Sequence, residues 1–107
     1  MVENEELEDL SMTIIAYAGS ARSNAFEAMS LANKKDFEGA REKLQAARED
    51  SDKSHDAHSE LLRKNAKGEI TRPDLLLSHA QDHLMCAALA MELIEEIVRL
   101  RRELEEK

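Results

Sequence analysis

The chain has 107 residues and a formal net charge of −8, which allows one domain with a modest core and disfavours nucleic acid as a partner, because phosphates attract Lys and Arg. Its 15 alanines, 3 glycines and single proline are typical of long helices. No apolar run reaches the ~18 residues of a membrane span, the acidic N-terminus lacks the features of a signal peptide, and the lone Cys86 cannot form an internal disulfide. We therefore expect a cytoplasmic protein with no direct membrane insertion.

Helical periodicity extends along nearly the whole chain, with two interruptions. The first helix is predicted over residues 5–33 and ends in the segment "ANKKDFEG". Asp36 in this segment can cap the next helix, because its carboxylate can accept hydrogen bonds from the free N–H groups of a first turn. The second helix is therefore predicted over residues 36–66.

The second interruption is the segment "NAKGEITRPD", which contains Gly68 and the only proline. Thr71 can act as the N-cap of a third helix, with Asp74 three residues later. Pro73 would then lie in the first turn, where its missing N–H costs little. The third helix is predicted over residues 73–105.

Short connections make consecutive helices antiparallel neighbours. The sequence thus predicts an all-α protein in which one domain, residues 1–107, forms an antiparallel three-helix bundle. On a helical wheel, the apolar residues of the third helix cover more than half of the circumference, whereas a helix in a three-helix unit buries a stripe of about 100° or somewhat more. We expect the surplus to be buried against another copy of the same chain.

Three titratable residues, His79, Asp82 and His83, lie within about 100° of one another on this apolar arc. Polar groups in such a setting need partners or a function. The residue pattern alone leaves both open, and it allows three functional interpretations. His79 and His83 are spaced to share a metal ion, with His55 and His58 of the second helix as further ligands. Alternatively, a neutral histidine acts as a nucleophile, or the cluster is an assembly device in which like charges meet across a symmetry axis.

Four segments resemble a known family. They are "AGSARSNAFEAM" at residues 18–29, "DFEGA" at 36–40, "KSHDAHSELL" at 53–62 and "HAQDHLM" at 79–85. Together they closely resemble the lactose/cellobiose-type enzyme IIA of the bacterial phosphoenolpyruvate-dependent sugar phosphotransferase system, a type that also serves N,N'-diacetylchitobiose. The resemblance covers nearly the whole chain.

The resemblance implies a specific function, that of a phosphotransferase component and not of a stand-alone enzyme. His79 would accept a phosphoryl group from the phosphocarrier protein HPr, as a tele-phosphohistidine, and pass it to a cysteine of enzyme IIB. His83 would support the phosphorylated state. The chain would form a homotrimer, a nine-helix bundle, with Asp82 of three subunits holding one Mg²⁺ or another divalent cation. The alternative is a structural or regulatory trimeric bundle that keeps the axial metal–aspartate cluster and carries no phosphoryl group.

The chain departs from the family pattern at several positions, among them Lys35 and His58. Lys35 stands where family members often have glycine, and His58 stands where glutamine is more usual. Neither departure removes a chemical group that the mechanism needs.

Overall fold

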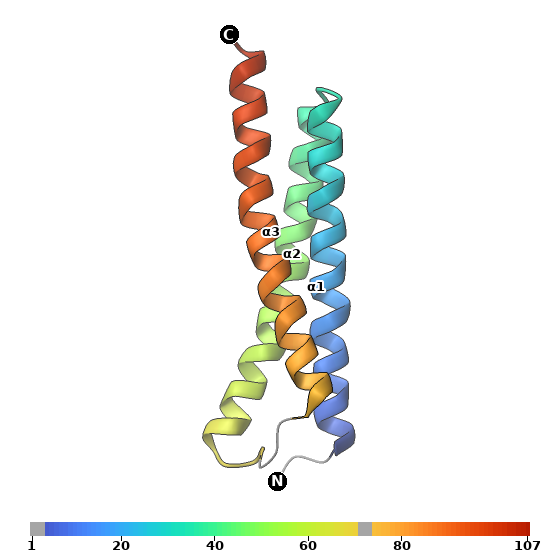
Figure 1. Ribbon diagram of the computed structural model, residues 1–107, viewed down its shortest axis with the longest axis vertical. Coiled ribbons are helices and arrows are strands. Elements are labelled where there is room, and N and C mark those ends of the chain that lie inside the picture. The colour runs from blue at the N-terminus through green and yellow to red at the C-terminus, as the bar shows by residue number, and fades with distance from the viewer. Residues whose placement is uncertain (1–3, 71–73) are drawn as a thin grey trace.

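Three long α-helices make up the computed structural model, which describes residues 4–70 and 74–107 (Figure 1). The helices are α1 (Asn4–Asn33), α2 (Phe37–Ala66) and α3 (Leu75–Glu105). α2 runs antiparallel to the other two, so α1 and α3 are parallel. The bundle is a rod of 57 × 19 × 19 Å. The predicted all-α, three-helix architecture is confirmed.

The starts of α2 and α3 are set by aspartate caps. The Asp36 carboxylate accepts a hydrogen bond from the Gly39 backbone N–H at 2.9 Å, and a side chain at position 39 would collide with that carboxylate. Asp74 accepts in the same way from the Leu77 N–H at 2.8 Å. The predicted start of the third helix at residue 73 was therefore wrong, because Asp74 is the cap and the helix begins one residue after it. Thr71, the predicted cap, lies outside the described residues.

The turns that follow α1 and α2 have the same hydrogen-bonding pattern. The Asp36 N–H donates to the carbonyl of Leu31, and the Glu69 N–H donates to that of Lys64, both at 2.9 Å. Such a turn places one residue in the left-handed region, where glycine is favoured. Gly68 fills this position after α2 with φ 73°, but Lys35 fills it after α1 with φ 68°. The turn after α1 therefore carries a side chain at a position that disfavours one.

α1 lies at the centre of the packing, since it contacts both other helices extensively while α2 and α3 touch only sparingly. The core is built mainly from small side chains, since most of its buried hydrophobic residues are alanines and the rest are larger aliphatic residues. Midway along the rod, two serines replace apolar residues on the buried face of α2. One of them, Ser54, is fully buried and donates a hydrogen bond to the carbonyl of Ile14 at 3.1 Å. The small side chains allow the helices to approach closely.

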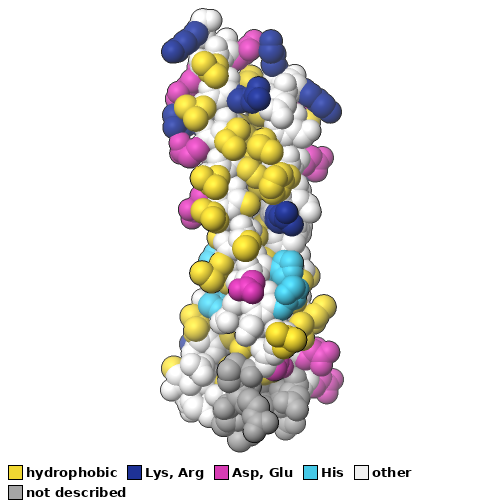
Figure 2. Space-filling view, in the orientation of Figure 1, with side chains coloured by type: hydrophobic (Ala, Val, Ile, Leu, Met, Phe, Trp, Pro, Cys, Tyr) yellow, Lys and Arg dark blue, Asp and Glu magenta, His cyan; other side chains and the backbone are white. Residues whose placement is uncertain are grey.

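One face of α3 is left uncovered by the single chain. It carries a row of large apolar side chains, which we call the exposed apolar stripe: Leu89, Leu93, Ile97, Leu100 and Leu104. Spacings of three and four residues place them along one seam, as in helices that pack against a partner. Figure 2 shows hydrophobic side chains gathered along the long face of the rod. Within the described residues, no helix combines the length and apolar character needed to cross a membrane.

Candidate functional site

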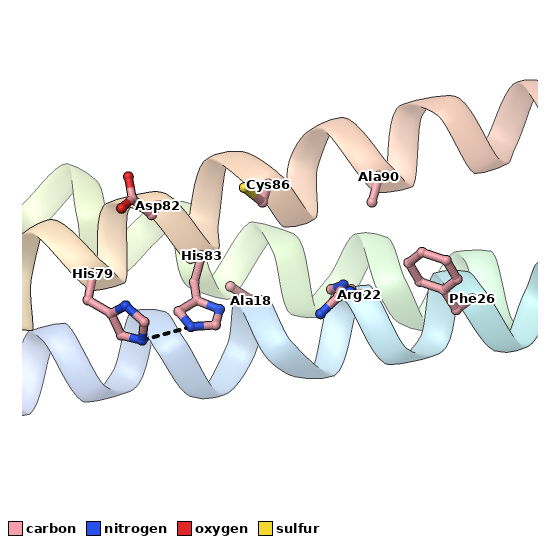
Figure 3. A pocket seen from close by; sticks show the side chains of 8 residues that line it. All are labelled: Ala18, Arg22, Phe26, His79, Asp82, His83, Cys86 and Ala90. Carbon is pink, nitrogen blue, oxygen red and sulfur yellow. Dashed lines mark hydrogen bonds between the residues drawn. The ribbon is translucent and has the colours of Figure 1, made fainter.

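Two histidines on successive turns of α3 form the centre of the candidate site. The Nε2 atoms of His79 and His83 lie 3.0 Å apart, within hydrogen-bonding distance. Their rings are nearly perpendicular, at 89°, with centroids separated by 4.4 Å (Figure 3). The spacing of four residues places both side chains on the same face of the helix. The imidazole of His79 is exposed, whereas His83 is half-buried.

The histidine pair opens into a surface groove of about 530 Å³ between α1 and α3. Besides the histidines, the groove is lined by Ala18, Arg22 and Phe26 of α1 and by Asp82, Cys86 and Ala90 of α3. Figure 3 shows both imidazoles directed toward α1. Ala18 is buried and small, so space remains in front of the rings. A group bound to the exposed imidazole would therefore remain accessible to a protein partner.

The contact between the two rings constrains their protonation. A hydrogen bond between two Nε2 atoms requires one of them to carry the proton and the other to offer its lone pair. If His83 donates, His79 keeps a free lone pair on Nε2 and carries its own proton on Nδ1. That tautomer is the nucleophilic form of imidazole. The pair can thus hold one ring ready to attack an electrophile in the groove.

Asp82 does not join the histidine pair. Its carboxylate points away from both imidazoles (Figure 3) and is exposed. Asp82 precedes Leu89 by seven residues, so it lies on the same seam of α3 as the exposed apolar stripe. The sequence grouped Asp82 with the histidines, and the structure places all three along one groove but directs them differently: the imidazoles face α1, and the carboxylate points away from them (Figure 3).

The histidines of α2 lie apart from the pair on α3. The Gln81 side-chain amide donates to Nε2 of His58 at 3.3 Å, which links α2 to a different face of α3. Partial burial lowers the pKa of His58, and the nearby charge of His55 lowers it further. Among residues 4–70 and 74–107, one chain brings together no three side chains that could hold a metal ion. The interpretation of a metal site built from four histidines was therefore wrong.

Among the groove residues that were not predicted as site residues, Arg22 and Phe26 have the largest side chains. Both come from α1, about 60 residues away from the histidines along the chain. One signal was available, because Arg22 is the only Lys or Arg in the first 33 residues. Helical periodicity could not show that this position faces the histidines.

Comparisons with known proteins agree with the resemblance noted in the sequence. A family profile described as "PTS system, Lactose/Cellobiose specific IIA subunit" matches residues 9–102. The chain is 42% identical over 104 residues to the lichenan-specific phosphotransferase enzyme IIA component of Bacillus subtilis, covering 97% of this chain and 94% of that protein.

The fold is also similar to the folds of solved structures. The cellobiose-specific enzyme IIA of Bacillus anthracis matches with a TM-score of 0.90 and 36% identity, over 100% of this chain and 96% of that one. The IIA(Chitobiose) of the Escherichia coli phosphotransferase system, solved in complex with HPr, matches with a TM-score of 0.81 and 36% identity, over 94% and 97% of the two chains. The chain therefore belongs to the lactose/cellobiose-specific IIA family of the sugar phosphotransferase system.

Proposed function

We propose that this protein is the phosphocarrier subunit of a disaccharide phosphotransferase system in the cytoplasm. In this proposal His79 accepts a phosphoryl group on Nε2 from the phosphohistidine of HPr and passes it to a cysteine of enzyme IIB. The observation that carries the proposal is the exposed imidazole of His79, paired with His83 at the mouth of an open groove. Family membership supplies the class of reaction.

The transfer needs little from the protein beyond position and charge. Phosphoryl transfer passes through a loose transition state, so catalysis consists mainly of alignment and electrostatic stabilisation. As the bond from phosphorus to Nε2 of His79 forms, the bond to the donor nitrogen breaks. The donor ring, protonated on its other nitrogen, leaves as a neutral imidazole that keeps the bonding electron pair. The Nε2–H of His83 can then donate to an oxygen of the transferred group.

Two protein partners follow from this role. A related IIA protein is known in complex with HPr, which supports HPr as the donor for this chain. The same histidine must also meet enzyme IIB, and an open groove of about 530 Å³ suits two successive partners better than an enclosed pocket would.

We further propose that the chain works as a homotrimer. The exposed apolar stripe of α3 would be covered by two other copies, and Asp82 of all three subunits would then lie near the common axis. Carboxylate oxygens are the ligands that Mg²⁺ prefers, so three Asp82 side chains fit one such ion. The cation would offset the mutual repulsion of the carboxylates, which makes Asp82 an assembly residue.

Phosphorylation in a reconstituted system tests the proposal. Phosphoenolpyruvate, enzyme I and HPr should add one acid-labile phosphoryl group per chain, measured by intact-protein mass spectrometry at neutral pH. His79→Gln should remain unmodified, and His55→Gln, which changes an exposed histidine of α2, should be modified like the wild type. A wild-type protein that takes up no phosphoryl group would favour the alternative, a trimeric bundle without a carrier function.

A further inference from the structure

Among the residues that the structure describes, one cationic side chain lines the groove beside the histidines, namely Arg22. It is also the only Lys or Arg of α1, a helix whose other charged residues are all acidic: Glu5, Glu6, Glu8, Asp9 and Glu27. The protein as a whole is acidic, so the positive charge of Arg22 favours the binding of an anion in the groove that holds the histidine pair. This position calls for an explanation beyond solubility.

The guanidinium of Arg22 is held in place without being neutralised. Its central carbon lies 5.4 Å from the centre of the Phe26 ring, a cation–π contact that occupies one face of the guanidinium plane and leaves its N–H edge free. Within the described part of the chain, none of the ion pairs involves Arg22. By contrast, Arg41 and Arg48 each bind a glutamate. Arg22 therefore keeps its donors available for a ligand.

The position of Arg22 on α1 places these donors in the same groove as the histidines. Side chains on a helix lean toward its N-terminus, and α1 runs parallel to α3. Arg22 lies one turn beyond Ala18, which sits beside His83 in the groove (Figure 3). The guanidinium of Arg22 therefore lies in the same groove as the imidazole pair, between Ala18 and the Phe26 ring (Figure 3).

From this arrangement we infer that Arg22 is a catalytic residue that binds the phosphoryl group during its transfer to and from His79. The inference rests on the proposed function. The transferred group carries negative charge on three oxygens, and a guanidinium offers two parallel N–H donors that match such oxygens. In the transfer step described above, Arg22 gains and loses no atom; it donates hydrogen bonds to oxygens whose charge it offsets. His83 and Arg22 would then hold the group from two sides.

Substitutions at Arg22 test the inference in single-turnover transfer from phosphorylated HPr. Arg22→Gln should lower the limiting rate constant by about tenfold or more, while the HPr concentration at half-saturation stays within about twofold of wild type. Arg22→Lys should recover part of the rate, because it restores the charge without the paired donors. Arg41→Gln, which removes an exposed arginine of α2, should transfer at the wild-type rate.

A second measurement reports on the phosphoryl group itself. A cation beside it lowers its pKa, so ³¹P NMR of the phosphorylated Arg22→Gln protein should show a titration midpoint higher by about 0.5 unit or more. Arg22→Met keeps the aliphatic stem over Phe26, so it provides the same tests if circular dichroism shows that the glutamine variant has lost helix.

Three results would overturn the inference, and they are distinguishable. An unchanged limiting rate with an unchanged ³¹P midpoint would show that Arg22 does not touch the phosphoryl group. A change confined to the half-saturating HPr concentration would make Arg22 a docking contact. A wild-type protein that accepts no phosphoryl group would remove the proposed function, and this inference with it.

Discussion

The proposed trimer makes a quantitative prediction about Leu89, which lies in the exposed apolar stripe. Its side chain is 58% exposed in the single chain. Complete burial of a leucine contributes about 1.5–3 kcal/mol, so covering the exposed part should contribute ~1–2 kcal/mol per subunit. Alanine keeps one methyl group, and Leu89→Ala should therefore cost about 1 kcal/mol per subunit and about 3 kcal/mol per trimer. That loss corresponds to an increase of ~100-fold in the dissociation constant of the trimer.

Sedimentation velocity over a dilution series measures this constant. Leu62→Ala is the matched control, because Leu62 is 53% exposed but lies on α2, outside the stripe. It should leave the dissociation constant unchanged. Leu89→Asp should abolish the trimer, since it would place an unpaired carboxylate in an apolar contact. A wild-type protein that is monomeric at tens of micromolar, or an aspartate variant that remains trimeric, would refute the argument that this face is the interface.

Three further predictions concern the proposed cation at Asp82, the turn that follows α1, and the pH dependence of stability. Asp82→Leu should still form a trimer, and its melting temperature should become insensitive to EDTA and Mg²⁺, whereas a monomeric product would contradict the assignment of the stripe as the main contact. Lys35→Gly should raise the free energy of unfolding by up to about 1 kcal/mol in urea denaturation, because it removes a side chain from a left-handed backbone position. A loss of stability would mean that the ion pair between Lys35 and Glu105 stabilises the fold by more than the backbone strain at Lys35 costs. Burial lowers the pKa of His58 below its ordinary value of 6.5, so the folded state favours the neutral ring and wild-type stability should fall as the pH drops below about 6.5. Because a glutamine side chain does not titrate in this range, His58→Gln should lose less stability over the same range in parallel melting curves, and identical pH profiles would exclude this contribution.

Much of the fold could be read from local patterns in the chain. The apolar periodicity identified three helices, and Asp36 marked the start of the second correctly because a cap acts on the N–H groups of the next few residues. The start of the third helix was predicted wrongly, because the prediction made Thr71 the cap although Asp74, three residues later, is also a good cap. The structure shows Asp74 in that role.

The candidate site shows the same division. The sequence alone determined that His79 and His83 share one face of a helix, since four residues make about one turn. Only the tertiary structure decided what lies opposite that face, namely a groove that Ala18 and Arg22 of α1 also line. It also decided that the carboxylate of Asp82 points away from both imidazoles. Helical period is a property of neighbouring residues, whereas the partner of each face depends on how segments about 60 residues apart pack together.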